Sequence, residues 1–327
     1  MDFGVVVPTW GPYASPEVFG ELVGRAEQLG YGHAWFGDHI VIPEYAVALS
    51  RARWFEAVAC CAFAAGRTDR LRFGFDVLVL PYRAPVHLAK QLATIDVLSG
   101  GRVTLAVGVG YLRGEFEALD TPPYEDRAAV TEEYVAVLRD LWSSPSPRTF
   151  AGRWVAYEDV HAEPRPVQTP TLPVWIGGNS ARARQRAAAL GDGWHPLWPS
   201  PDEYRQARRE IAAGRAAAGR DGAFTFSYSC PETRVLPEGV RPVGRPPYGG
   251  AARSAEFDYA PAVPQRDGRP ILQGTKAQLL DDVAALADAG VEQLSLRFWA
   301  GSADVTPEVF LSQMEVFADG VLDKRTG

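Results

Sequence analysis

The stretch PVHLAKQLATIDVLSGGRVTLAVGVG, residues 85–110, contains the unit from which the fold can be deduced. Residues 85–102 show a helical pattern that stops at the glycine pair Gly100 and Gly101. Residues 103–110, VTLAVGVG, form a short apolar run that ends in glycines, as a buried strand does. A helix followed by a buried strand is the repeating unit of α/β folds with a parallel sheet.

The same alternation continues on both sides of this stretch. Buried strands are predicted at residues 3–8, 33–39, 71–81, 103–110, 173–180, 192–197, 224–229 and 292–298. Helices are predicted at residues 15–30, 55–65, 85–102, 127–142, 181–190, 201–217, 275–290 and 307–319. Eight strands that alternate with helices favour a single α/β domain, a (β/α)8 TIM barrel over residues 1–327, rather than a doubly wound sheet.

Two segments exceed ordinary connecting loops. Residues 142–172 contain a predicted hairpin around residues 150–157, and residues 231–270 are dense in proline and glycine. Segments of this length are uncommon unless they act as lids, binding loops or disordered regions. We therefore expect a barrel with insertions, the longest at about residues 231–270.

Composition narrows the class of protein. The chain has 46% hydrophobic and 22% charged residues, as ordinary globular enzymes do, and its net charge of −7 argues against nucleic acid as the main partner. The N-terminus, MDFGVVVPTW, has neither the basic start of a signal peptide nor an apolar run long enough for a membrane. Cys60, Cys61 and Cys230 lack zinc-ligand spacing and are interpreted as reduced core residues. We expect a cytoplasmic protein with no membrane partner.

An acid and an imidazole, Asp38 and His39, stand together at the end of the second predicted strand. Active sites of such barrels lie at the carboxyl ends of the strands. A buried acid beside a histidine can hold the imidazole in one tautomer or raise its pKa. Asp76 stands inside the third apolar strand, where a lone acid is costly unless it is paired or faces a cavity. The alternatives are a hydrogen-bonded structural pair at residues 38–39 and a solvent-facing edge acid at position 76.

Glycines end two other predicted strands. Gly108, Val109 and Gly110 end the fourth strand, where small residues let a ligand approach the backbone, although a tight structural turn is the more ordinary explanation. The fifth strand runs into WIGGNSARAR. Free backbone N–H groups at the start of the following helix, with an arginine nearby, would form an anion site, and a simple helix cap is the alternative. The residues of this predicted anion site are Gly177, Gly178, Asn179, Ser180 and Arg182.

Aromatic residues follow the sixth strand. The rings of Trp194, His195 and Trp198 suit a planar conjugated ligand, although aromatic core packing is more common. Arg297 at the last strand could meet a substrate anion, with a surface ion pair as the alternative. The histidines show no paired metal-ligand spacing, and the chain contains neither a G-x-S-x-G elbow nor a P-loop. We therefore expect no metal site.

Three blocks of sequence carry a resemblance to a known family. AEQLGYGHAWFGDH (residues 26–39), LPYRAPVHLAKQLATIDVLSGGRVTLAVGVGYLRGEFEAL (residues 80–119) and PVWIGGNSARARQRAAALGDGWHPL (residues 173–197) look like the bacterial luciferase-like superfamily. They resemble most closely its coenzyme F420-dependent oxidoreductases. The match covers most of residues 1–198 and the last helix–strand units, and it omits residues 231–270.

The resemblance implies a barrel, often a homodimer, that binds a deazaflavin or flavin at the mouth. It implies a non-proline cis peptide behind the cofactor ring at Asp76–Val77, so that both residues contact the cofactor, and it puts His39 near the reactive ring carbon with Asp38 beside it. Val79 replaces a threonine that relatives often carry at the cofactor. The other positions that the resemblance assigns to the cofactor are Gly108, Val109, Gly110, Gly177, Gly178, Asn179, Ser180 and Arg182.

One departure from the family argues against glucose 6-phosphate as the substrate. Relatives that oxidise glucose 6-phosphate have a glutamate where this chain has Tyr111 and an asparagine where it has Gly114, and they hold the sugar phosphate with lysines. Lysine occurs here only at Lys90, Lys276 and Lys324, so this substrate is not expected.

The sequence therefore predicts an F420-dependent oxidoreductase that transfers a hydride between the deazaflavin and a small organic substrate. His39 would act as general acid or base, and Asp38 would orient it or touch the cofactor. The residues expected to face the substrate are Trp10, Tyr111, Trp194, His195, Trp198 and Arg297. The alternatives are an FMN-dependent monooxygenase, a non-catalytic flavin or deazaflavin carrier and, more weakly, a cofactor-free lyase.

Overall fold

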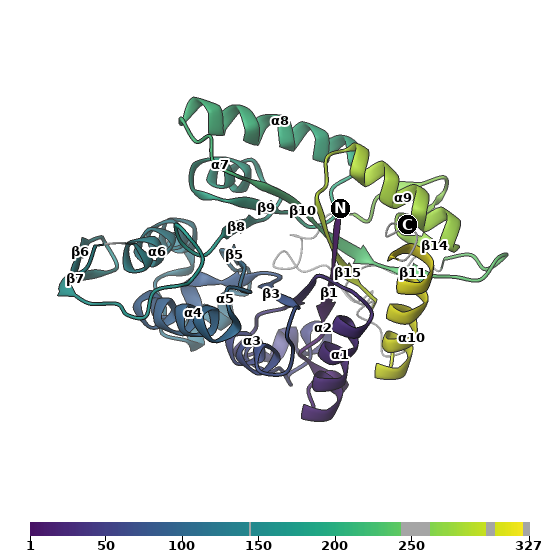
Figure 1. Ribbon diagram of the computed structural model, residues 1–327, viewed down its shortest axis with the longest axis horizontal. Coiled ribbons are helices and arrows are strands. Elements are labelled where there is room, and N and C mark those ends of the chain that lie inside the picture. Colours follow the sequence, from purple (N-terminus) through teal and green to yellow (C-terminus); the bar gives the residue numbers. More distant parts are fainter. Residues whose placement is uncertain (144, 243–261, 299–304, 323–327) are drawn as a thin grey trace.

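The predicted strands form one parallel barrel sheet in the computed structural model, which describes residues 1–143, 145–242, 262–298 and 305–322 (Figure 1). Neighbouring strands follow the order β3-β2-β1-β15-β10-β9-β8-β5-β4. Their bounds are β1 Asp2–Val7, β2 His33–Phe36, β3 Arg72–Phe75, β4 Leu78–Val79, β5 Leu105–Gly108, β8 Val174–Gly177, β9 Gly193–His195, β10 Thr225–Glu232 and β15 Gln293–Arg297. The TIM-barrel prediction is confirmed.

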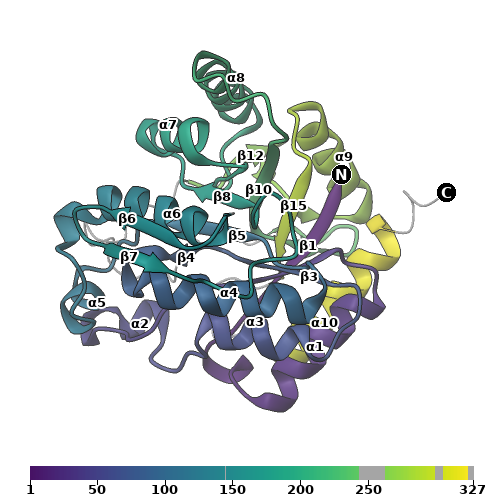
Figure 2. The ribbon, with the colours of Figure 1, turned by 60° about the vertical axis from the view of Figure 1, so that its left-hand side comes forward.

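Helices cover the outside of this sheet (Figures 1 and 2). The main ones are α1 Pro16–Gln28, α3 Ala57–Ala65, α4 Pro85–Ser99, α6 Arg127–Trp142, α7 Ala181–Leu190, α8 Pro201–Ala217, α9 Lys276–Asp288 and α10 Pro307–Phe317. Two short helices, α2 Val47–Ser50 and α5 Arg113–Ala118, lie in the segments that follow β2 and β5. Hydroxyl side chains cap several helix starts, as Ser15 does by accepting from the Val18 N–H at 3.2 Å.

The third strand differs from its prediction. The sequence predicted one strand over residues 71–81, but β3 ends at Phe75 and β4 begins at Leu78. Between them, the Asp76–Val77 peptide bond is cis, in agreement with the resemblance. The two pieces pair with different neighbours, β3 with β2 and β4 with β5, and a parallel bridge from Phe73 to Val103 closes the ring.

Two tryptophans fill the barrel interior. Trp35 on β2 and Trp175 on β8 are buried with their ring centroids 5.4 Å apart. Glycines on the adjoining strands leave room for them, since a Cβ on Gly74 would lie 2.2 Å from Trp35 and one on Gly193 would lie 2.5 Å from Trp175. The interior is thus packed rather than open, and a ligand can enter only from the mouth.

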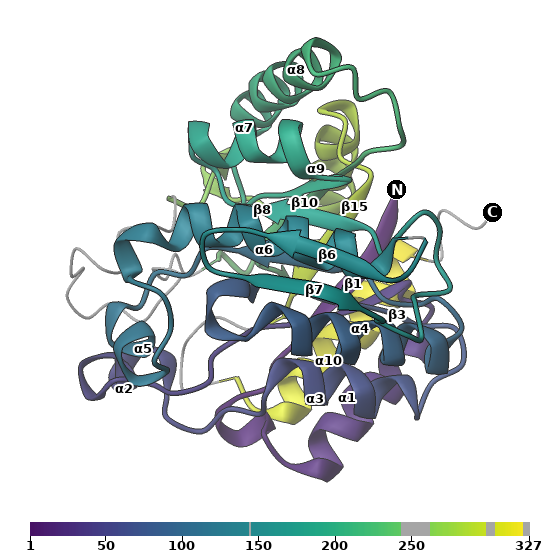
Figure 3. The same cartoon turned by 90° about the vertical axis from the view of Figure 1, so that its left-hand side faces the viewer.

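Both long insertions contain additional strands. β6 Arg148–Ala151 and β7 Ala156–Val160 form an antiparallel hairpin, as predicted, which Figure 3 shows as a pair. In the insertion at residues 231–270, β12 Gln265–Arg266 pairs with β13 Arg269–Pro270, and β11 Arg234–Val235 pairs with β14 Gln273–Gly274, which lies just after the insertion. The central part of that insertion, residues 243–261, lies outside the described residues.

The remaining composition-based expectations concern cysteines and membranes. Cys60, Cys61 and Cys230 are free thiols and are buried, as expected of core residues. Among the described residues, no helix combines the length and apolar character needed to cross a membrane.

Candidate functional site

A cavity of about 860 Å³ opens at the carboxyl ends of the barrel strands, and its volume is typical of small-molecule sites. Its lining comes from segments that follow β1, β2, β4, β5, β8, β9 and β15. Most of the predicted site residues line it: Trp10, Asp38, His39, Asp76, Val77, Val79, Gly108, Val109, Gly110, Tyr111, Gly177, Gly178, Asn179, Ser180, His195 and Arg297.

Three predicted residues do not line the cavity. Arg182 is exposed in the first turn of α7. Trp194 and Trp198 are buried in the hydrophobic core, where Trp194 packs on Tyr204 with ring centroids 5.2 Å apart. Trp194 also donates a hydrogen bond to the Gly178 carbonyl at 2.9 Å. For both tryptophans the more ordinary interpretation, aromatic core packing, is correct, and their assignment to the substrate is not supported.

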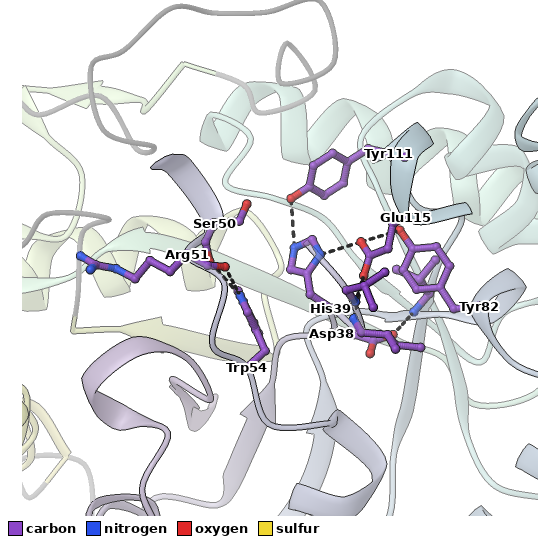
Figure 4. Close-up of polar contacts among 12 residues, drawn as sticks. Asp38, His39, Ser50, Arg51, Trp54, Tyr82, Tyr111 and Glu115 are labelled. Atoms are coloured by element: carbon purple, nitrogen blue, oxygen red, sulfur yellow. Dashed lines mark hydrogen bonds and ion pairs between the residues drawn. The ribbon is translucent and has the colours of Figure 1, made fainter. Parts of the chain in front are cut away.

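His39 is held at the cavity wall by groups from three other segments (Figure 4). Its Nδ1 lies 2.9 Å from a carboxylate oxygen of Glu115, which is completely buried on α5. Its Nε2 lies 3.2 Å from the Tyr111 hydroxyl. The edge of its ring meets Trp54, with centroids 4.7 Å apart. The imidazole therefore has a fixed orientation.

The hydrogen bonds around Glu115 determine the tautomer of His39. The carboxylate accepts from the backbone N–H groups of Ile40 at 2.6 Å and Val41 at 3.2 Å, and from the Tyr82 hydroxyl at 3.0 Å. Burial, and then the Glu115 charge, raise the pKa of Tyr82 far above its usual value, so this hydroxyl remains a donor. Because the Glu115 carboxylate accepts from these three donors, His39 also donates to it from Nδ1, and the Nε2 of this tautomer carries the lone pair, 3.2 Å from the Tyr111 hydroxyl.

Asp38 does not orient His39, which corrects one of its two predicted roles, whereas contact with the cofactor stays a prediction because Asp38 lines the cavity. Its two oxygens accept a bidentate pair from Arg83, at 2.7 and 2.8 Å, and one of them also accepts from the Val79 N–H at 2.8 Å. Arg83 is held on its other side by Glu56 at 2.6 Å. Asp38 thus fixes β4 to the end of β2. Asp38 and His39 are adjacent in sequence but have separate partners, because their side chains point in different directions.

Asp76 stands at the cavity floor in a network of its own. It pairs with the Arg297 guanidinium and lies 2.8 Å from His195 Nε2, and it accepts a hydrogen bond from the Ser229 hydroxyl at 2.8 Å. Burial alone would raise the pKa of Asp76, but the Arg297 charge and the bonds from His195 and Ser229 outweigh it and hold the pKa below its ordinary value. Asp76 is therefore ionised, and Arg297 makes a buried ion pair rather than a surface one.

The strand-end glycines have a packing role that sequence reasoning did not identify. A Cβ on Gly108 would lie 2.4 Å from Val77, and one on Gly177 would lie 2.8 Å from the same side chain. Gly110, at φ +80°, would meet Val79 at 2.7 Å. These glycines accommodate the two valines of the divided strand, which in turn form part of the cavity wall.

The end of the cavity beside α7 is suited to an anion. Ser180 caps α7 by accepting from the Ala183 N–H at 3.1 Å, and both residues line the cavity at the positive end of the helix dipole. Asn179 is used structurally, since its side chain donates to the Leu197 carbonyl at 2.7 Å and accepts from the Leu197 N–H at 2.8 Å. Two further arginines line the cavity from α6 and α7, which contact each other.

Those arginines are Arg127 on α6 and Arg186 on α7, and Arg186 takes the place that the sequence assigned to Arg182. Arg186 lies one helical turn after Arg182 and pairs with Glu132 at 3.0 Å. Arg127 stacks on Tyr124, and its buried Nε has no hydrogen-bond partner among the described residues. Helical spacing from Ser180 was a signal for Arg186, because residues 180, 183 and 186 of a helix share one face.

Other functional side chains had no comparable signal. Glu115 and Arg83 are separated from their partners His39 and Asp38 by 76 and 45 residues, and only the fold brings them together. Among the described residues, no group of three or more histidine, cysteine, aspartate or glutamate side chains is arranged to hold a metal ion.

Comparison with known proteins relates this architecture to a family. Residues 1–233 match the family model described as luciferase-like monooxygenase. The FMNH2-dependent dimethylsulfone monooxygenase of Pseudomonas putida is 28% identical over 250 residues, which cover 69% of this chain and 68% of that protein. The F420-dependent glucose-6-phosphate dehydrogenase of Amycolatopsis mediterranei is 32% identical over 192 residues, 56% of each chain.

Solved structures show the same fold. The monooxygenase RslO1 from Streptomyces bottropensis superposes with a TM-score of 0.77 at 21% identity, over 99% of this chain and 100% of its own. An F420-dependent secondary alcohol dehydrogenase superposes with a TM-score of 0.76 at 19% identity, over 98% of both chains. Relatives therefore include both F420-dependent and FMN-dependent enzymes. The chain belongs to the luciferase-like monooxygenase family.

Proposed function

We propose that the protein is a coenzyme F420-dependent oxidoreductase that transfers a hydride between the deazaflavin and a small organic substrate. The observation that carries this proposal is the Nε2 of His39, which lies beside the cavity-lining Tyr111 and is held as a proton acceptor by the buried carboxylate of Glu115. Oxidation of an alcohol removes a hydride and a proton, and a fixed imidazole lone pair is suited to take the proton.

The cavity residues fit a deazaflavin. Val77 and Val79 supply an apolar wall with glycine backbone on either side, which suits the face of a planar ring. The α7 N-terminus, Arg127 and Arg186 supply positive charge for an anionic tail. When bound, the deazaflavin would supply a two-electron hydride donor or acceptor.

The roles of the chain's own groups follow from their contacts. His39 would exchange a proton with the substrate oxygen through Nε2, and Tyr111, 3.2 Å from that nitrogen, would pass the proton on or hold the oxygen. Glu115 would stabilise the imidazolium that forms, because the carboxylate already accepts from Nδ1. Trp10 and Trp54 would exclude water from the substrate side of the cavity.

An FMN-dependent monooxygenase is the second candidate. It is favoured by the FMNH2-dependent relative, and the same anion-binding end would suit the single phosphate of FMN. A carrier without catalytic activity is a third candidate. It would bind the cofactor tightly and exchange no hydride with any substrate.

Titration with both cofactors tests the proposal. We expect F420 to bind more tightly than FMN, measured by quenching of cofactor fluorescence, and F420 absorbance to bleach anaerobically with members of an alcohol panel. His39→Ala should keep cofactor affinity and lower turnover by roughly 10²-fold or more. Selective binding of FMN with oxygen uptake would favour the monooxygenase. Full turnover of His39→Ala would remove the proposed role of the imidazole.

A further inference from the structure

Arg51 differs from the other arginines that line the cavity. Arg113 pairs with Glu125 at 2.7 Å, Arg186 pairs with Glu132 at 3.0 Å, and Arg297 pairs with Asp76. The Arg51 guanidinium has no carboxylate partner among the described residues. Its Cζ lies 5.4 Å from the centroid of the Trp10 ring, which also lines the cavity.

The backbone at Arg51 is unusual for an arginine. Its φ of 60° and ψ of 154° fall in a region that is essentially restricted to glycine. The surrounding segment holds it there, since the Trp54 indole N–H donates to the carbonyls of Ser50 at 2.8 Å and Arg51 at 3.1 Å. Non-glycine residues in such conformations cluster at functional sites, where their side chain is needed.

Hydrogen bonds also fix this segment to the loop that follows β1. The Gly11 N–H donates to the Arg53 carbonyl at 2.9 Å, and the Phe55 N–H donates to the Thr9 carbonyl at 2.7 Å. Trp10 and Trp54 are joined by an antiparallel bridge. The backbone that carries the Arg51 guanidinium is thus fixed by hydrogen bonds to a neighbouring segment.

Figure 4 shows the Arg51 guanidinium directed away from the His39 imidazole, and Trp54 adjoins both residues, with its ring centroid 4.7 Å from that of His39 and its indole N–H 3.1 Å from the Arg51 carbonyl. A ligand that contacts both residues therefore has to extend past the Trp54 ring. Its charged end would be remote from the atom that exchanges a proton with His39. Arg127, the other cavity arginine without a carboxylate partner among the described residues, belongs to the α6–α7 end and would serve the cofactor tail.

We propose that the substrate is an organic anion with an apolar or aromatic body, whose carboxylate or similar group binds Arg51 at a distance from the reacting carbon. The reaction of this substrate near His39 rests on the proposed function, but the binding of its anionic group at Arg51 does not, because binding does not require catalysis. The chain is acidic overall, with a net charge of −7, so a cavity arginine that has no carboxylate partner among the described residues is not a consequence of composition.

The test compares acids with their uncharged amides. Hydroxymethylbenzoate, phenylpropionate and cinnamate, each paired with its amide, are titrated into the full chain and followed by tryptophan fluorescence and calorimetry. The proteins are wild type, Arg51→Gln, Arg51→Gly and the control Arg209→Gln, which removes an exposed charge on α8. F420 and FMN titrations accompany every protein.

We expect at least one acid to bind wild type roughly tenfold more tightly than its amide, as a charge-assisted pair would provide. Both Arg51 variants should reduce that ratio to about one without changing cofactor affinity, and Arg209→Gln should retain it. Arg51→Gly should also melt at a higher temperature than Arg51→Gln, because glycine relieves the backbone.

Two outcomes would overturn the inference: no acid is preferred by the wild type, or the preference survives in both Arg51 variants. These outcomes are separate from failure of the proposed function. If neither cofactor binds but acids still depend on Arg51, the anion site stands and the oxidoreductase proposal fails. If F420 binds and exchanges hydride while neutral alcohols bind as well as acids, the oxidoreductase proposal stands and the anion site fails.

Discussion

At the scale of single residues, Glu115 is the group on which His39 depends. Replacing it by glutamine preserves the shape but introduces an N–H2 group, which can donate to His39 Nδ1 and move the imidazole proton to Nε2. We expect Glu115→Gln to lower turnover by roughly 10²-fold or more, because Nε2 of His39 would then carry a proton and could not accept one from the substrate. Nitrogen-15 NMR of the histidine ring should show the exchanged tautomer, which a loss of stability alone would not produce.

Glu125→Gln is the matched control. Glu125 is an exposed carboxylate that pairs with Arg113 and belongs to the same region of the chain. Its replacement should leave both the tautomer and turnover unchanged. An unaltered His39 spectrum in Glu115→Gln would contradict the argument.

A second residue-scale prediction concerns acid stability. Since the folded pKa of Asp76 is below its ordinary value, the group stabilises the fold above the unfolded pKa of about 3.9, and this contribution is lost as pH falls through the folded pKa. Asp76→Asn leaves Arg297 buried without its counter-charge, so we expect the free energy of unfolding to fall by about 3–5 kcal/mol at pH 7. The gap between variant and wild type should narrow below about pH 4.

Urea unfolding at pH 7 and at about pH 3 measures that gap. Asp202→Asn provides the comparison, because Asp202 pairs with Arg205 in solvent and should contribute less than about 1 kcal/mol. A gap of equal size at both pH values would show that ionisation of Asp76 does not stabilise the fold.

At the scale of elements, the alternation of helix and strand patterns was sufficient to predict the barrel. Each helix shows apolar residues at helical spacing, and each buried strand is a short apolar run. The division of the third strand at Asp76–Val77 was not deducible from periodicity, since residues 71–81 form one apolar run. The candidate site was predicted where residues follow strand ends, as with His39 and Ser180. A site residue was missed where it lies far in sequence from the residue that it contacts, as Glu115 does from His39.

Glycine positions give an element-scale prediction. Gly74→Ala on β3 would put a Cβ 2.2 Å from the Trp35 ring, which strand neighbours hold in place, so we expect a loss of about 3 kcal/mol or more in unfolding free energy. Gly24→Ala in the middle of α1 is the control, because a Cβ there meets nothing within 4 Å. That variant should be more stable by about 0.5–1 kcal/mol, from helix propensity.

Thermal and denaturant unfolding of both variants decide this point. Adding Trp35→Phe to Gly74→Ala should recover part of the loss, since the smaller ring makes room for the methyl group. Equal stability of Gly74→Ala and wild type would mean that the barrel interior is not as closely packed as the structure indicates.

At the scale of the whole molecule, we propose that two copies of the chain associate through the outer face of α3 and α4, which lie side by side in Figure 2. Leu98 on α4 is 80% exposed, and Val86 and Val97 on the same helix and Phe63 on α3 are also exposed. A large contiguous patch of exposed apolar side chains is typical of protein interfaces. In a monomer these apolar side chains would stay exposed to water, and their burial between two chains would contribute favourable free energy to dimer formation.

Leu98→Arg tests this association, because a charge in the centre of an apolar contact is expensive to bury. We expect sedimentation to give twice the 35.6 kDa chain mass for wild type and the single chain mass for Leu98→Arg. Val309→Arg, a similar change on α10, should leave the dimer intact. A monomeric wild type would reject the dimer, and a dimeric Leu98→Arg would move the interface to another face. Because Leu98 lies outside the cavity lining, cofactor affinity of the monomeric variant would then show whether one barrel suffices for binding.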